Sequence, residues 1–82
     1  MVRVKFIING DPVEVVINPG APLRDAVQQV LQQSNNTGRP LADWELRDDM
    51  GRLLSIDRSF ADHAWLADNN YLFVTQSVGA GG

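Results

Sequence analysis

The chain contains no cysteine, so disulfide bonds, thiolate metal ligands and a thiol nucleophile are excluded for this sequence. No apolar run approaches the ~20 residues of a membrane-spanning helix, and the amino end alternates in polarity instead of forming a signal-peptide block. Lys and Arg together number 7 against 10 Asp and Glu, without a basic cluster. We therefore expect a cytoplasmic protein that binds neither nucleic acid nor membranes.

Catalytic residues are also scarce. His63 is the only histidine, and neither Ser55 nor Ser59 has the sequence context of a nucleophilic serine. Asp48 and Asp49 are adjacent, lack the spacing of a calcium loop and are typical of a turn. We interpret His63 as a solvated histidine, and we expect no enzymatic activity, no metal site and no cofactor.

The chain does have enough apolar residues for a single core, since 44% of its 82 residues are hydrophobic. Residues 1–9 and 13–17 alternate in polarity around Asn9-Gly10-Asp11, which predicts an amino-terminal hairpin. Pro22 suits the first position of a helix, and apolar residues recur at helical spacing from residue 23 to residue 31. Residues 35–38 tolerate a left-handed backbone, so the helix is expected to end there.

The second half of the chain predicts three further strands. Residues 44–47 alternate, residues 48–51 form a turn into a short strand at 52–55, residues 57–62 have the composition of local turns, and residues 71–75 form the last strand. This order predicts an α+β fold of the β-grasp type: a mixed sheet with one helix packed on one face. Because the helix supplies a long crossover, the first and last strands can pair in parallel at the sheet centre.

With this element order, this length and the terminal Gly81-Gly82, the chain resembles ubiquitin and its relatives. More narrowly, several segments resemble single-domain bacterial ubiquitin-like proteins encoded beside E1-like, E2-like and JAB-type metalloprotease genes in conjugation operons associated with phage defence. The segments that carry this resemblance are Val15 to Leu23, Asn36 to Gly38, Trp44 to Asp48, Gly51 to Leu54 and Leu72 to Val74.

The resemblance implies a protein modifier. An E1-like enzyme would adenylate the Gly82 carboxylate, and the acyl group would then pass to target proteins. An E2-like enzyme would be a further partner, and a JAB-type protease would release the modifier from its targets. Domain boundaries then fall at 1–76 for the ubiquitin-like domain, expected to be monomeric, and at 77–82 for a flexible tail. Glycine suits a carboxylate that must thread a narrow channel, because it has no Cβ atom. Val78, Gly79 and Ala80 would be read by the enzymes that bind this tail.

Two other functions stay open. A sulfur carrier has the same fold and the same Gly-Gly end, but would carry a terminal thiocarboxylate. A non-covalent interaction module would bind partners through an edge strand or a sheet face, and the glycines would then be incidental.

A binding face follows from the alternation of the last strand. We place Leu72 and Val74 inside by likeness to ubiquitin, which leaves outside a candidate partner surface made of Tyr71, Phe73, Arg47, Glu45 and Ile7. Lys5 is the only lysine and hence the only side-chain amine on which a chain of modifiers could grow, although a plain solvent-facing strand residue is the simpler interpretation.

Overall fold

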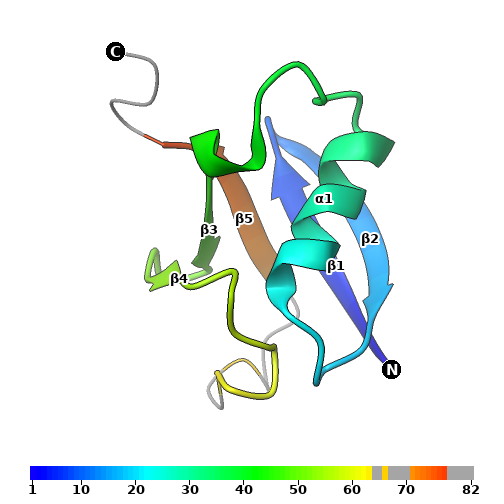
Figure 1. Ribbon diagram of the computed structural model, residues 1–82, viewed down its shortest axis with the longest axis vertical. Helices are drawn as coiled ribbons and strands as arrows, with labels where there is room; N and C mark the ends of the chain where they lie inside the picture. The colour runs from blue at the N-terminus through cyan, green and yellow to red at the C-terminus, as the bar shows by residue number, and fades with distance from the viewer. Residues whose placement is uncertain (64–65, 67–70, 78–82) are drawn as a thin grey trace.

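The computed structural model describes residues 1–63, 66 and 71–77, and within them one helix packs on one face of a five-stranded sheet (Figure 1). The strand order is β2-β1-β5-β3-β4, which confirms the α+β β-grasp fold. The elements in chain order are β1 (Val2–Ile8), β2 (Asp11–Ile17), α1 (Leu23–Gln33), the 3₁₀ helix η1 (Leu41–Asp43), β3 (Trp44–Asp48), β4 (Leu53–Leu54) and β5 (Tyr71–Gln76).

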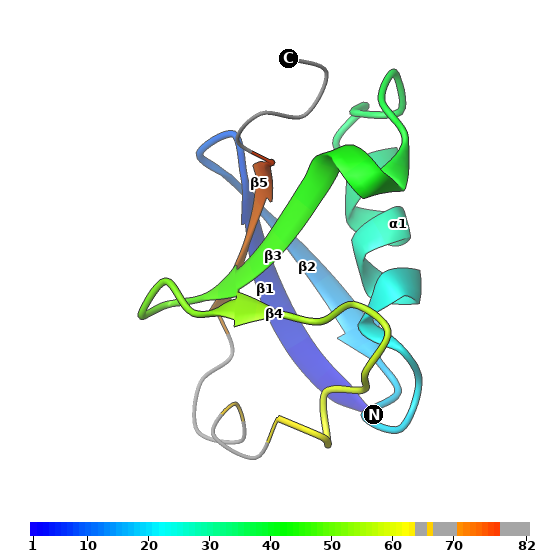
Figure 2. The ribbon, with the colours of Figure 1, turned by 60° about the vertical axis from the view of Figure 1, so that its left-hand side comes forward.

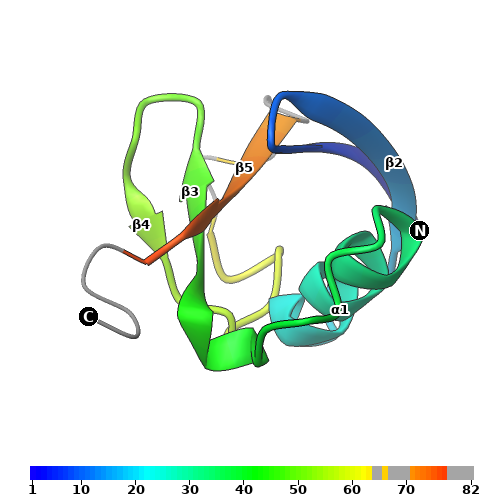
Figure 3. The same ribbon diagram turned by 90° about the horizontal axis from the view of Figure 1, so that it is seen from above.

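The centre of the sheet joins the two ends of the chain. β1 and β5 pair in parallel, with Lys5 opposite Tyr71 and Ile8 opposite Val74, as the sequence predicts. Antiparallel pairings add β2 to the free side of β1 and β3 to the free side of β5. Seen from above, the sheet curves around α1, so only one of its faces is covered by the helix (Figure 3).

The turn between β1 and β2 explains the strength of the first hairpin signal. Asn9 and Gly10 both have positive φ, at 51° and 82°. These are the backbone angles of a two-residue type I′ turn, whose twist matches that of the flanking strands and which favours Asn-Gly. The register from Val2 opposite Ile17 to Ile8 opposite Asp11 follows from this turn.

The start of α1 differs from the sequence expectation by one position. Pro22 is the residue before the helix, with ψ of 140°, and not its first helical residue. No side chain caps this end; instead the Leu23 amide donates to the Arg58 carbonyl at 2.9 Å and the Arg24 amide to the Ile56 carbonyl at 2.8 Å. A backbone segment distant in the sequence therefore accepts hydrogen bonds from two of the amides that have no partner within the first turn of the helix.

The other end of α1 confirms the expected left-handed residue. Asn35 has φ of 62°, and the Asn36 amide donates to the Leu31 carbonyl at 2.8 Å. The turn η1 follows Pro40, and no periodic pattern in the sequence predicted it. None of the helices in the described part of the chain combines the length and the apolar character needed to cross a membrane.

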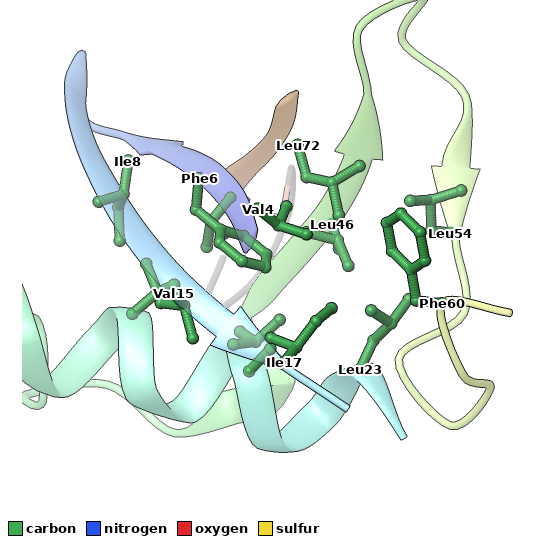
Figure 4. Packing of buried hydrophobic residues seen from close by; sticks show 14 of the residues in the cluster. Val4, Phe6, Ile8, Val15, Ile17, Leu23, Leu46, Leu54, Phe60 and Leu72 are labelled. Atoms are coloured by element: carbon green, nitrogen blue, oxygen red, sulfur yellow. The ribbon is translucent and has the colours of Figure 1, made fainter. Parts of the chain in front are cut away.

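The hydrophobic core lies between α1 and the covered face of the sheet (Figures 2 and 4). Leu72 and Val74 are 0% and 1% exposed, which confirms that these two residues of β5 point inward. Phe6, on the neighbouring strand, is also 0% exposed. The other buried hydrophobic residues are Val4, Ile8, Val15, Ile17, Leu23, Ala26, Val27, Val30, Leu31, Trp44, Leu46, Leu54, Phe60 and Leu66.

Asp48 does more than begin a turn, since it is a buried carboxylate. Only 1% of the residue is exposed, and its oxygens accept hydrogen bonds from the amides of Met50 and Arg52 and from the Arg52 Nε, at 2.8 to 2.9 Å. Gly51 completes the turn with φ of 83°. The β3–β4 hairpin is thus organised around one ionised side chain.

We expect Asp48→Ala to lower the free energy of unfolding by about 2–4 kcal/mol, because two amides and a guanidinium would lose a charged acceptor. Urea unfolding followed by circular dichroism measures the change. Asp49→Ala, at the exposed neighbouring position, is the matched control and should stay within about 0.5 kcal/mol of the wild type. Equal stability of the two variants would contradict a structural role for Asp48.

The interpretation of His63 as a solvated histidine is wrong. The residue is 5% exposed, and its Nδ1 lies 2.9 Å from the Ser59 carbonyl oxygen. Two reciprocal bonds between Ser59 and Asp62 close the preceding turn and direct the chain back onto the core. His63 is therefore a packed residue at the end of this turn.

Candidate functional site: the outer sheet face and the end of β5

The face of the sheet opposite α1 brings the predicted partner surface together. Ile7 lies opposite Phe73 across the parallel pair, and Phe73 lies opposite Arg47 across the antiparallel pair. Tyr71 lies two residues before Phe73 on β5, and Glu45 lies two residues before Arg47 on β3, so both are on the same face. We call these five residues the outer face. The expectation that they share one surface is met by the strand register.

The register also adds two residues that the sequence reasoning missed. Pro12 lies opposite Ile7, and Leu53 lies opposite Arg47. A single row therefore runs across all the strands of the sheet, from Pro12 through Ile7, Phe73 and Arg47 to Leu53. Leu53 is 61% exposed, and its outward direction could have been inferred from its buried neighbour Leu54.

The charges of this face are arranged in pairs. Arg47 donates to Glu45 at 2.9 Å and to the Gly51 carbonyl at 2.8 Å, and Arg3 lies 3.5 Å from Glu14. Because these side chains are partly exposed, each pair contributes little to stability. The two bonds made by Arg47 instead fix where its guanidinium lies on the strand beside Phe73, so that the face offers a partner both an aromatic ring and a positioned guanidinium.

Lys5 lies on the same face, beside the aromatic end of β5. Its Nζ is 5.4 Å from the centroid of the Tyr71 ring, within the range of a cation–π contact. Such a contact gives the long side chain a packing partner on the surface of the sheet. This geometry favours the simpler interpretation of Lys5 as a surface strand residue.

The end of β5 is held by the turn η1. The Ser77 amide donates to the Asp43 carbonyl at 2.8 Å, and the turn lies beside the final residues of the strand in Figure 1. Val78, Gly79, Ala80, Gly81 and Gly82 lie outside the described residues. In the described part of the chain, no three His, Asp or Glu side chains are grouped in a way that could hold a metal ion.

This architecture is that of a ubiquitin-like domain. The chain superimposes with a TM-score of 0.71 on the solution structure of the N-terminal ubiquitin-like domain in the 4931431F19Rik protein, at 14% identity, covering 93% of this chain and 74% of that one. It also superimposes with a TM-score of 0.73 on the crystal structure of ATBAG1 in complex with HSP70, at 16% identity, covering 99% of this chain and 43% of that one. These similarities establish the ubiquitin-like β-grasp fold.

Within that class, the chain belongs to the family described as "Protein of Unknown function (DUF2604)", whose model matches residues 1–82. A relative at 30% identity over 81 residues is the "Uncharacterized protein y4jI" of Sinorhizobium fredii (strain NBRC 101917 / NGR234). The match covers 99% of this chain but only 62% of that protein, so the relative is substantially longer.

Proposed function

We propose that this chain is a ubiquitin-like protein modifier that an E1-like enzyme activates at the Gly82 carboxylate and that is then conjugated to target proteins. We further propose that it acts in the bacterial cytoplasm, within a conjugation pathway of antiphage defence that also contains an E2-like enzyme and a JAB-type metalloprotease. The chain itself supplies no catalytic group in this proposal. Its contribution is a folded body for recognition and a glycine carboxylate for chemistry.

The observation that carries the proposal is the position of β5. In a ubiquitin-like fold, this central strand ends at Gln76, and Gly81-Gly82 follow within six residues of it. Six extended residues reach about 20 Å, enough to carry a carboxylate away from the domain into the active site of an enzyme. Glycine at that position lets the backbone enter a channel too narrow for side chains.

Because the relative from S. fredii is longer than this chain, a form that continues past Gly82 has to be considered. If the natural chain continues past Gly82, a protease must cut after this glycine before activation. An extended Gly-rich segment is the form in which proteases grip a substrate, as an added strand. The JAB-type enzyme of the proposed pathway has this role in maturation as well as in release.

The outer face supports a second candidate function, a non-covalent interaction module. The row from Pro12 to Leu53 presents apolar and aromatic side chains beside positioned charges, and the structural neighbour ATBAG1 was solved in complex with HSP70. In this function the terminal glycines are not needed, and their deletion leaves partner affinity unchanged. The sulfur carrier remains a third alternative, which the mass of the protein distinguishes.

We expect higher-mass adducts of this chain in cells that express it together with its neighbouring genes, and no adducts from a variant that lacks Gly81 and Gly82. Gel shift shows the adducts, and intact mass and peptide mass spectrometry locate the bond at Gly82. Gly20→Ala, in the turn before α1, is the matched glycine control, because an added Cβ at this position meets only the Asn18 Oδ1, at an ordinary contact distance of 3.5 Å. This control should retain the full level of adducts.

The three functions predict different results. Adducts that join Gly82 to protein amines or hydroxyls would support the modifier. Exchange of one oxygen for sulfur without protein adducts would establish the sulfur carrier. If neither adducts nor this exchange is found, the interaction module is the remaining function. Adducts that persist at the wild-type level after deletion of the two glycines would refute the modifier hypothesis.

A further inference from the structure

A pocket of about 250 Å³ lies where the end of β5 meets the loop after α1. The residues that line it are Asn35, Asn36, Gly38, Arg39, Trp44 and Gln76. These residues are rich in hydrogen-bond donors, and the lining contains no carboxylate. The pocket lies on the covered side of the sheet, away from the outer face, because Trp44 points inward on β3.

Trp44, one of the lining residues, has a donor without a partner in the described part of the chain. The residue is 6% exposed, and its indole Nε1 is a buried donor without a hydrogen-bond partner among the described residues. A buried N–H group normally has a partner, since removing it from water without one is unfavourable. An indole nitrogen can only donate, so whatever completes this site must supply an acceptor.

Arg39 sets the charge of that acceptor. Its Nη1 lies 3.7 Å from the Asp43 carboxylate, and the side chains of the two residues are 49% and 24% exposed. This long, partly exposed contact leaves most of the five guanidinium donors available and holds the side chain loosely. Because the Trp44 Nε1 is buried, a ligand reaches it only if a lining side chain moves, and the loosely held Arg39 is able to do so. The charge of Arg39 favours an anion over a neutral carbonyl.

We propose that this pocket is a binding site for a carboxylate, and that its natural occupant is a Glu or Asp side chain of a partner protein. The carboxylate accepts from the Trp44 Nε1 and from the Arg39 guanidinium, and the Asn35 and Gln76 amides complete the polar surround. A planar carboxylate offers two oxygens with several acceptor positions, which suits donors that converge from different elements.

The position of the pocket indicates which partner brings the carboxylate. Gln76 is the last residue of β5, and the next residue, Ser77, is anchored to η1 through the Asp43 carbonyl at 2.8 Å. Gln76 lines the pocket, so a protein that binds the sequence following Ser77 has this pocket within reach. This step rests on the proposed function: the enzyme that grips the tail inserts an acidic side chain here and so fixes the domain relative to the tail.

The carboxylate site itself can be tested without any enzyme. The full chain, labelled with ¹⁵N, is titrated with N-acetylglutamate methylamide and, in parallel at equal ionic strength, with the corresponding glutamine compound. The indole N–H signal of Trp44, assigned by its loss in Trp44→Phe, is expected to shift and saturate with a dissociation constant of about 1–10 mM for glutamate. We expect the glutamine compound to bind at least about tenfold more weakly.

Arg39→Gln is the second variant, because its partly exposed side chain can change without opening the core. It should weaken glutamate binding at least about fivefold and leave the unfolding transition unchanged. No saturable shift of the Trp44 indole signal, or equal shifts with both compounds, would overturn the proposal. A lower dissociation constant for acetate than for the glutamate compound would identify a site for free small carboxylates. This result would overturn the assignment to a protein side chain.

A failed titration leaves Gly82-dependent conjugation untouched, because the titration uses no enzyme and no tail chemistry. Conversely, an absence of adducts would remove the enzyme as the partner but not the carboxylate site.

Discussion

One tryptophan added after Gly82 is expected to abolish adduct formation when the chain cannot be trimmed. In the proposed function, the reacting group is a carboxylate carried by a glycine that passes through a narrow channel. The added residue moves the carboxylate onto an amino acid with a bulky side chain and blocks that passage. The measurement compares adducts in cells that express the neighbouring genes but lack the JAB-type protease that the proposed function requires, and intact mass verifies that the extension is still present.

The control carries the same tryptophan at the amino terminus, before Met1, and should form adducts at the wild-type level. Met1 is 83% exposed, so the extension does not displace packed residues. Restoring the protease should also rescue the chain extended after Gly82, because cleavage regenerates the glycine carboxylate. Adducts that form on the untrimmed extension would show that Gly82 is not the activated residue.

Phe6→Ala is expected to destabilise the domain by about 3–5 kcal/mol, the usual cost of removing a buried phenylalanine ring. Phe6 is 0% exposed at the sheet centre, where it lies opposite Val13 on β2 and Leu72 on β5. A domain of 82 residues has a total stability of roughly 4–12 kcal/mol, so this single change removes a large part of it. Urea unfolding monitored by circular dichroism gives the difference.

Val16→Ala is the control on the neighbouring strand. Val16 is 52% exposed, and shortening it should change the stability by no more than about 0.5 kcal/mol. A loss of less than about 1 kcal/mol for Phe6→Ala would mean that the core is packed loosely around the parallel pair.

The fold could be predicted from the sequence because its strongest signals are local. The alternation around Asn9-Gly10 requires a hairpin, and the alternation of residues 71–75 leaves only two choices of inward face. Likeness to ubiquitin decided that choice correctly for Leu72 and Val74. The outer face followed from the same alternation, since its five residues occupy the outward positions of three adjacent strands.

The residues that were misread depend on contacts distant in the sequence or on geometry that composition does not encode. His63 is buried because the turn from Ser59 folds back onto the core, and a single histidine in a polar segment gives no sign of this. The helix begins one residue later than expected because carbonyls of the segment 56–58 replace a local cap. For Asp48 a signal existed: it continues the inward alternation of Trp44 and Leu46.

The parallel pairing of β1 with β5 has a consequence for synthesis on the ribosome. The strand that fills the middle of the sheet is the last of the five strands to be made. Until residues 71–76 have left the ribosome, β1 and β3 therefore each lack one of their two neighbouring strands. Contacts between chain ends form late, because the intervening loop must close first. A chain that terminates early therefore exposes unpaired strands to proteases instead of folding, so that the pool of folded protein consists of molecules whose synthesis has proceeded through β5.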